Sequence, residues 1–158
     1  ILWHDVFRIS CSGKRKIKKV IFKKKIIYSI CLFEIQNDFI KKAAKAAAYA
    51  REFGTAYVKA LSACPLNWND RPDTERKVIA AAVDCCYFPL YEIERGITSL
   101  SYDPKKSHKK IPVTEWFSMM GRTKHLATEE YKSVADQIQA EVDRRYERLA
   151  ACAEHPLL

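Results

Sequence analysis

Apolar residues at helical spacing open the orderly part of this sequence, which begins near residue 36. They lie three or four residues apart and predict a helix with one buried side: Phe39, Ala43, Ala46, Ala50 and Phe53. Asn37 or Asp38 can cap the start of this helix, and Gly54 is suited to its end. The next run, TAYVKALSA, has apolar residues at both parities. That pattern predicts a strand covered on both faces, as in a parallel sheet flanked by helices.

The later pattern predicts more helices around a β-hairpin. A second helix is expected from Pro72 up to Pro89, with an inward apolar stripe. The runs LYEIE and ITSLSYD flank Arg95-Gly96 and predict two strands joined by a turn. The run KKSHKK predicts a solvated loop. VTEWFSMM predicts a short helix that ends at Gly121, and Thr128 is expected to cap a long helix to about Ala153.

Together these elements predict an α/β fold, the C-terminal portion of a parallel-sheet domain with a small hairpin and C-terminal helices. One central strand cannot form a sheet by itself, so the domain is expected to be incomplete. We divide the chain into an atypical basic segment at 1–35, an α/β part at 36–126 and a helical extension at 127–158. Residues 1–35 are rich in Lys, Ile and Phe without a clear period, and we expect them to be disordered or not native to the domain.

The net charge of +9 at first suggests a nucleic-acid partner, but the charge is confined to one end. Residues 1–33 hold nine Lys/Arg against one acid, while residues 34–158 hold 19 basic and 18 acidic residues. A basic block of this kind is commonly a solvated arm, so we disfavour nucleic acid as a partner. A non-catalytic module whose basic tail contacts nucleic acid or another polyanion remains the alternative function.

Cysteine use and hydropathy indicate a cytoplasmic protein with no membrane contact. The six cysteines include no C-x-x-C pair, and adjacent Cys85 and Cys86 are poor disulfide partners, so reduced thiols are expected. The longest apolar run, Ile26 to Phe33, is far shorter than the roughly 20 residues that span a bilayer. We identify no secretory signal.

Cys64 is the candidate ligand because of its position. It follows the buried strand, and ligands of open α/β sheets gather at the carboxyl ends of strands. Pro65 fixes its own φ and stiffens the turn, and Trp68 is expected to shield one side of whatever Cys64 touches. Cysteine ligands of iron–sulfur clusters are often followed by proline. On these grounds alone, a structural cysteine is still favoured.

Four ordered motifs shift this balance toward a functional site. The chain contains Gly54-Thr55-Ala56-Tyr57, Cys64-Pro65-Leu66-Asn67-Trp68, Phe88-Pro89-Leu90-Tyr91-Glu92 and Gly121-Arg122-Thr123-Lys124-His125-Leu126. In this order the motifs resemble the beta, thiamine-diphosphate-binding subunit of pyruvate:ferredoxin oxidoreductase and, more broadly, of 2-oxoacid:ferredoxin oxidoreductases. The motif resemblance covers residues 37–150, the C-terminal part of that subunit, and leaves out residues 1–35.

The resemblance implies a role for Cys64 and a reaction. Cys64 would be the distant fourth ligand of a 4Fe–4S cluster beside thiamine diphosphate and Mg²⁺. The complex would decarboxylate a 2-oxoacid, with pyruvate preferred over a branched-chain acid, and use coenzyme A to give an acyl-CoA, CO₂ and reduced ferredoxin. The implied partners are the alpha, gamma and delta subunits or their fused equivalents, together with ferredoxin.

The sequence also departs from the family pattern. It has no C-x-x-C pair for the other cluster ligands and no Gly-Asp-Gly segment for magnesium and diphosphate. Cys11 and Cys31 have the wrong context to replace the missing cysteines. We therefore expect the chain alone to retain no cofactor and to be inactive. A truncated or misread gene product with no independent function is a further alternative.

The remaining candidates are expected to be structural. Cys85 and Cys86 are placed as core thiols within the second helix, and Glu92 and Glu94 are expected to face solvent. A surface role without chemistry is favoured for the residues near the motifs: Asn67, Asn69, Arg122 and His125.

Overall fold

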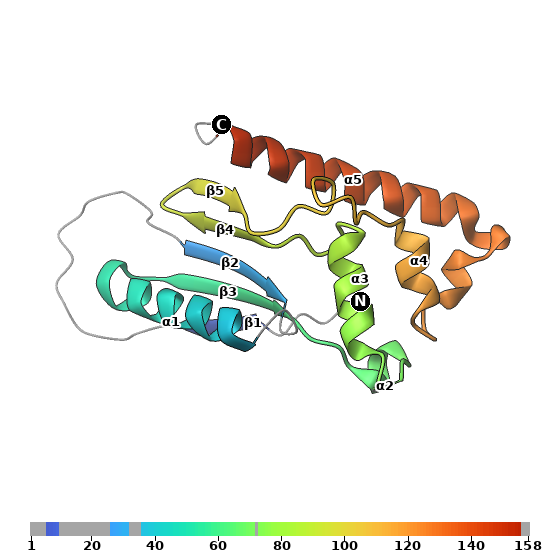
Figure 1. Cartoon of the computed structure of the whole chain (residues 1–158), viewed down its shortest axis with the longest axis horizontal. Coiled ribbons are helices and arrows are strands. Elements are labelled where there is room, and N and C mark those ends of the chain that lie inside the picture. The colour runs from blue at the N-terminus through green and yellow to red at the C-terminus, as the bar shows by residue number, and fades with distance from the viewer. Residues whose placement is uncertain (1–5, 10–25, 32–35, 72, 156–158) are drawn as a thin grey trace.

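The computed structural model describes residues 6–9, 26–31, 36–71 and 73–155, with side chains from residue 40 onward. Within these residues helices and strands are interspersed along the chain, as Figure 1 shows. The strands are β1 (Val6–Ile9), β2 (Ile26–Cys31), β3 (Ala56–Leu61), β4 (Tyr91–Glu94) and β5 (Ile97–Leu100). The helices are α1 (Gln36–Phe53), α2 (Pro65–Trp68), α3 (Glu75–Asp84), α4 (Val113–Ser118) and α5 (Lys132–Glu154), with 3₁₀ turns η1 (Lys124–Ala127) and η2 (Glu129–Tyr131) before α5.

The five strands form one mixed sheet in the order β1-β3-β2-β4-β5. β2 and β3 are parallel, with Ile26 opposite Ala56 and Cys31 opposite Leu61. The other three strand pairs are antiparallel. The α/β class is therefore confirmed for the described residues, while parallel pairing is limited to one strand pair. The hairpin supplies the antiparallel edge because a short turn reverses the chain.

The sheet crosses the boundary that was expected at residue 35. β3 has a neighbour on each side, and both neighbours, β1 and β2, come from residues 1–35. β3 is therefore not a single central strand, because β1 and β2 both pair with it. The different origin assigned to residues 1–35, and the three-part division of the chain, stay predictions. The rest of the first 35 residues lies outside the described part.

α1 covers one face of the sheet, as the periodicity predicted. Ala46, Tyr49 and Ala50 are buried against Ala56 and Val58 of β3. Gly54 follows the helix with a φ of 113°, a conformation that glycine adopts without strain. Lys45 of α1 also reaches the hairpin. Its ammonium lies 3.4 Å from Glu92 and 3.1 Å from Glu94, so these two acids are not simply solvated.

The hairpin turn has the geometry that Arg95-Gly96 predicted. Arg95 and Gly96 have φ values of 55° and 88°, and two successive positive φ values are typical of the type I′ turn. Two predicted helix ends are wrong. α3 ends at Asp84, because Cys86 adopts a positive φ of 63° that breaks the helix. α5 begins at Lys132, because the Thr128 hydroxyl donates to the carbonyl of His125 within the preceding 3₁₀ turns.

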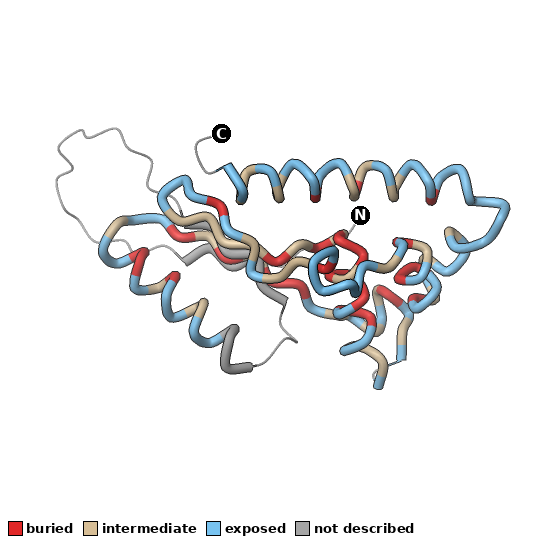
Figure 2. The backbone as a smooth tube through the Cα atoms, turned by 45° about the horizontal axis from the view of Figure 1, so that its top comes forward, coloured by how far each residue is buried: buried red, intermediate tan, exposed pale blue. Residues whose placement is uncertain are grey.

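The main core lies where α2, α3, α4 and α5 meet, at the other end of the molecule from α1 (Figure 1). The apolar residues along one side of α4 and the turn after it are all buried: Val113, Trp116, Phe117 and Met120. α5 lies across this core and the hairpin with its outer side exposed along most of its length (Figure 2). Val142 and Tyr146 of α5 belong to the same core, so the C-terminal helix is part of the packed structure.

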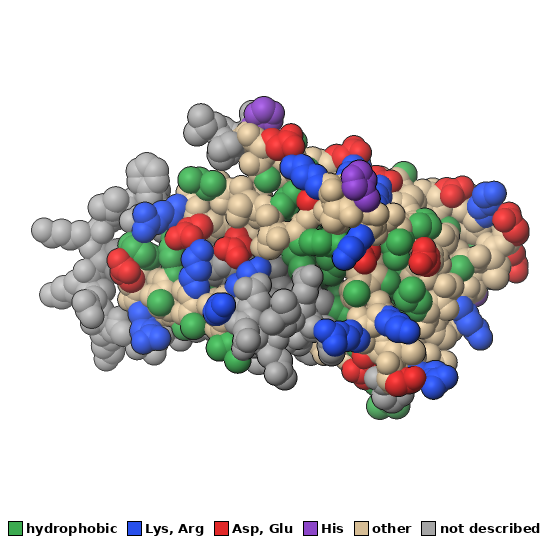
Figure 3. Space-filling view, in the orientation of Figure 1, with side chains coloured by type: hydrophobic (Ala, Val, Ile, Leu, Met, Phe, Trp, Pro, Cys, Tyr) green, Lys and Arg blue, Asp and Glu red, His purple; other side chains and the backbone are tan. Residues whose placement is uncertain are grey.

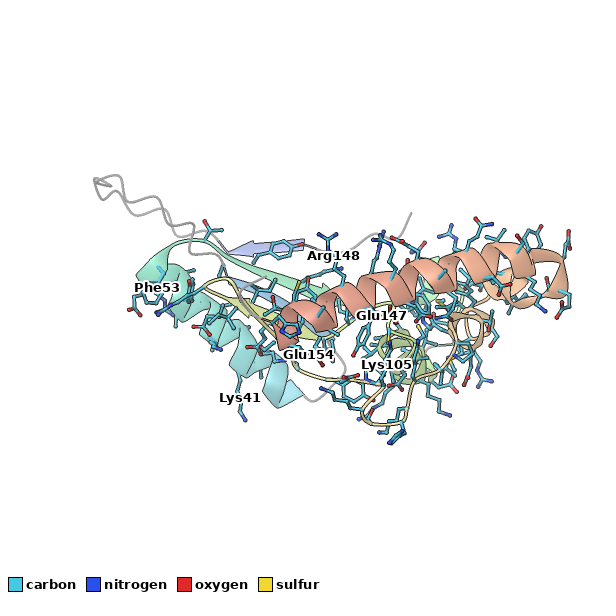
Figure 4. All side chains as sticks on the ribbon, turned by 90° about the horizontal axis from the view of Figure 1, so that it is seen from above. Lys41, Phe53, Lys105, Glu147, Arg148 and Glu154 are labelled. Carbon is cyan, nitrogen blue, oxygen red and sulfur yellow. The ribbon has the colours of Figure 1, made fainter. Side chains whose placement is uncertain are left out.

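A buried tyrosine fixes α5 to the loop after the hairpin. The Tyr146 hydroxyl donates to Asp103 at 2.7 Å, and Asp103 also accepts the backbone N–H of Lys105 at 2.9 Å. Partial burial raises the pKa of Asp103, but these hydrogen bonds outweigh it and hold the pKa below its usual range. Figure 4 labels Lys105 and Glu147, which form an ion pair of 3.3 Å between the same two elements.

Replacing Tyr146 with phenylalanine tests this attachment. We expect Tyr146→Phe to lower the free energy of unfolding by about 1.5–3 kcal/mol at pH 7, the range for a hydrogen bond to a charged group. The pKa of Asp103 is depressed in the folded chain, so its contribution is present above the unfolded pKa of about 4 and is lost as the pH falls further.

Urea unfolding of both proteins between pH 7 and pH 3 measures this difference. The difference in free energy of unfolding between wild type and Tyr146→Phe should become smaller below about pH 4. Tyr131→Phe is the matched control, because Tyr131 is exposed at the start of α5. An equal difference at all pH values would show that lost packing, rather than the Asp103 carboxylate, causes the destabilisation.

Candidate functional site

Cys64 lies on the turn that joins β3 to α2, as its sequence position predicted. Its thiol is free and exposed, and its carbonyl oxygen accepts the backbone N–H groups of Asn67 at 3.0 Å and Trp68 at 2.8 Å. Pro65 occupies the first turn of α2, where its missing N–H costs no hydrogen bond. The backbone of the turn is therefore fixed while the sulfur faces outward.

Trp68 lies in the core beneath the surface, and its expected shielding of whatever Cys64 touches stays a prediction. It is 5% exposed and packs edge-on against Trp116 of α4, with 6.2 Å between ring centroids. Trp68 thus anchors α2 to the core from the side opposite the solvent. The exposed residue of α2 is Leu66, which is 96% exposed and lies two positions from Cys64.

A close backbone contact joins the Cys64 turn to the segment after α4. The N–H of Gly121 donates to the carbonyl of Asn69 at 3.0 Å, and the N–H of Arg122 donates to the carbonyl of Trp68 at 3.2 Å. A Cβ atom at Gly121 would lie 2.5 Å from the Asn69 side chain and 2.7 Å from its carbonyl oxygen. Asn69 accommodates this contact in a left-handed conformation with φ of 52°. We call this pair of hydrogen bonds the Asn69–Gly121 clamp.

The Arg122 side chain returns to the same turn. Its guanidinium donates to the side-chain oxygen of Asn67, across 55 positions of sequence. Arg122 and Asn67 therefore belong to one site. No sequence pattern indicated that these two residues are in contact. His125 lies apart from them, where its ring packs edge-on against Tyr131 at 5.2 Å between centroids.

The sequence signal for this clamp was only indirect. Gly121 was interpreted as the end of a helix, and no local period connects it to Asn69. The one available hint was the joint occurrence of the Cys-Pro-x-x-Trp and Gly-Arg motifs, since residues that occur together in two motifs are candidates for contact.

An open cleft of about 700 Å³ lies beside α2 and α4. Aromatic and aliphatic side chains dominate its walls, and the polar groups come from Asn67, Arg122 and Thr123. Its other lining residues are Trp68, Tyr87, Trp116, Phe117, Met120, Leu126 and Ile138. We call it the tryptophan cleft. Burial raises the pKa of Tyr87, so this phenol stays protonated and neutral.

Cys85 and Cys86 are unsuited to bind a metal. Both residues are buried, and burial raises the pKa of their thiols to about 12 and about 11. The prediction that they are core thiols is confirmed, although they lie in the turn after α3 rather than within it. No cluster of three His, Cys, Asp or Glu side chains that could hold a metal occurs among the described residues.

Comparison with curated proteins shows consistent relatives. Over 153 residues the chain is 31% identical to pyruvate synthase subunit PorB of Thermotoga maritima, covering 90% of this chain and 45% of that protein. It is 29% identical to ketoisovalerate oxidoreductase subunit VorB of Pyrococcus horikoshii, covering 90% of this chain and 46% of that protein. Over 102 residues it is 31% identical to pyruvate synthase subunit PorB of Methanocaldococcus jannaschii, covering 65% of this chain and 32% of that protein. No protein-family model matches the chain.

These relatives are all subunits of oxidoreductases. The chain is a homologue of the PorB and VorB beta subunits of pyruvate and ketoisovalerate:ferredoxin oxidoreductases, which confirms the resemblance carried by the four motifs. It spans about half the length of the curated relatives it matches. The match covers 90% of the 158 residues, and only 123 residues follow position 35. The matched part therefore extends into the first 35 residues. The motif comparison, which left out residues 1–35, is corrected in this respect.

Substituting Gly121 tests the clamp. We expect Gly121→Ala to destabilise the chain by about 1–3 kcal/mol, because its methyl group would overlap Asn69 and force the turn to move. Gly54→Ala is a comparison that costs backbone strain alone, since a Cβ there meets nothing within 4 Å. Urea midpoints measure both changes. If Asn69→Gly fails to recover any stability in the Gly121→Ala background, contact with the Asn69 side chain is not the cause.

Thiol labelling tests the exposure of Cys64. At pH 8 a short pulse of N-ethylmaleimide should modify Cys64 before Cys85 and Cys86, because those two thiols are enclosed. With a pKa of about 12, only about one Cys85 thiol in 10⁴ is ionised at that pH. Peptide mass spectrometry gives the order of labelling, and denaturant should abolish the difference. Equal rates for Cys64 and Cys85 in the folded chain would contradict the arrangement.

Proposed function

We propose that this chain is part of the beta subunit of a 2-oxoacid:ferredoxin oxidoreductase, with pyruvate as the preferred substrate. The observation that carries the proposal is 31% identity to a pyruvate synthase subunit along 90% of the chain. The complete enzyme would oxidatively decarboxylate the 2-oxoacid with coenzyme A, giving an acyl-CoA, CO₂ and reduced ferredoxin. The mixed sheet with helix α1 on one face would be the C-terminal portion of the thiamine-diphosphate-binding domain.

Within this enzyme Cys64 is the proposed cluster ligand. Cys64 fits one corner of a 4Fe–4S cluster, because its thiol is exposed at a strand end on a turn whose backbone hydrogen bonds are already formed. Cys85 and Cys86 are enclosed, and no group of three His, Cys, Asp or Glu side chains that could hold a metal occurs among the described residues. The other three thiolates would come from residues outside this part of the subunit.

Each group near Cys64 then has a positioning role. When bound, thiamine diphosphate with Mg²⁺ supplies carbanion chemistry, and the cluster transfers single electrons toward ferredoxin. The protein holds the Cys64 sulfur in place through Pro65, through the anchor of Trp68 in the core, and through the Asn69–Gly121 clamp. Backbone fixed in this way presents the thiolate without a further cost of ordering the turn.

The proposed partners are the other subunits of the enzyme, alpha, gamma and delta or fused equivalents, with ferredoxin as electron acceptor. Charge on the described surface supports this assignment over a nucleic-acid module. Figure 3 shows Lys/Arg and Asp/Glu side chains interspersed over the face in view, without a continuous basic field. Within the described residues, no helix is long and apolar enough to cross a membrane. A cytoplasmic location is in keeping with the free thiols of Cys64, Cys85, Cys86 and Cys152.

Reconstitution tests the ligand role. By itself the chain should bind no cluster and have no activity, because one thiolate cannot hold four irons. Anaerobic reconstitution with iron and sulfide, together with the separately produced portion of Thermotoga maritima PorB that this chain does not match, should restore the visible absorbance of a 4Fe–4S centre. Cys64→Ser should remove most of that absorbance.

Cys152→Ser is the matched control, because Cys152 is a half-buried thiol on α5, away from the Cys64 turn. It should leave the absorbance unchanged. Equal absorbance from wild type and Cys64→Ser would show that Cys64 is not a ligand. A cluster bound by this chain in the absence of the PorB portion would contradict the proposed division of the site.

A further inference from the structure

The tryptophan cleft carries an unpaired hydrogen-bond donor. Trp116 is 2% exposed, and its indole N–H has no acceptor among the described residues. The ring of Tyr87 lies 4.6 Å from the Trp116 ring and that of Phe117 lies 5.6 Å away, between centroids. These aromatic rings enclose the indole, and the Tyr87 hydroxyl does not accept its N–H. A buried donor left unpaired costs about 1–3 kcal/mol, so an acceptor supplied from outside would stabilise the site.

The charge in the cleft has one sign. Arg122 is exposed at the cleft and contributes a guanidinium, while no Asp or Glu lines it. Asn67 accepts one hydrogen bond from Arg122, which leaves other N–H groups of the guanidinium for a further acceptor. The cleft is thus complementary to an apolar group accompanied by a carboxylate or another oxygen acceptor.

A second exposed apolar group lies on α2. Leu66, next in sequence to Asn67 of the cleft wall, is almost fully exposed, and the clamp ties the end of α2 to the segment after α4. Exposed apolar side chains together with an open apolar cleft are typical of an interaction site. The relatives contain more than twice the matched length, so a large part of their subunit lies outside what this chain represents. These two facts identify the occupant as polypeptide.

We propose that the tryptophan cleft and Leu66 form a docking surface for a segment from the part of the subunit outside this chain. The segment inserts an apolar side chain between the aromatic walls, places a carboxylate against Arg122 and gives an oxygen to the Trp116 indole N–H. The neighbouring rings cover that N–H in the free chain, so one wall side chain, such as half-buried Tyr87, turns when the segment enters. This inference rests on the proposed function, since it takes the chain as one part of a longer subunit.

The test mixes this chain, labelled with ¹⁵N, with the portion of Thermotoga maritima PorB that it does not match. We expect a one-to-one complex, with a changed resonance for the Trp116 indole N–H. Three tryptophans give three indole signals, and Trp116→Phe assigns the relevant one. Titration calorimetry should show that Arg122→Gln weakens binding about tenfold and Trp116→Phe about fivefold, as expected for losing one polar contact each.

Lys109→Gln is the matched control, because it removes one positive charge from an exposed loop that does not line the cleft. It should bind like wild type. Circular dichroism checks that Trp116→Phe remains folded, and exposed Arg122→Gln provides an independent test of the same surface. No complex, or a complex that both variants form as tightly as wild type, overturns the proposal. The proposal is also overturned if two copies of this chain bind each other through the cleft and thereby exclude the PorB portion.

The outcomes separate docking from the role of Cys64. A complex that depends on Arg122 but gains no 4Fe–4S absorbance on reconstitution supports the docking surface and counts against the cluster assignment. A cluster formed equally well by wild type and by Arg122→Gln, with unchanged affinity, supports the cluster assignment and removes the docking surface.

Discussion

The contact between Gly121 and Asn69 determines how the two parts of this chain meet. It joins the turn at the end of β3 to the segment after α4, at a separation that only a residue without Cβ permits. Trp68 then packs on Trp116, and Arg122 reaches Asn67. The position of Cys64 and the shape of the tryptophan cleft both follow from this approach, because both lie on the backbone that the clamp fixes.

The same region sets the Cys64 thiol apart from the other cysteines whose side chains the structure describes. Cys85 and Cys86 are enclosed in the core, and burial raises the pKa of both thiols, which keeps them protonated and unreactive. Cys64 differs because its turn is anchored from beneath by Trp68, so the sulfur remains outside while the backbone stays rigid. This combination suits the ligand role that we propose for Cys64, since movement of the sulfur would cost binding energy each time a cluster forms.

An open aromatic cleft next to an exposed leucine is unusual for an isolated domain but natural for part of a longer subunit. The match to about half the length of PorB and VorB gives the same indication from an independent source. The sheet of the described residues differs from the domain type that the family resemblance implies. Its one parallel pair, β2 with β3, is edged by antiparallel strands, whereas that domain type is built on parallel pairing.

The sequence by itself determined the type of most elements and the position of Cys64. Periodicity shows whether each segment buries one side or two, and residues such as Gly54 and Arg95-Gly96 carry their own backbone preferences. It did not determine where α3 ends, that β1 and β2 flank β3, or that Tyr146 binds Asp103. Those features depend on which distant segment covers each buried side. Only the tertiary structure decided them, because a local pattern records that a surface is buried and not what buries it.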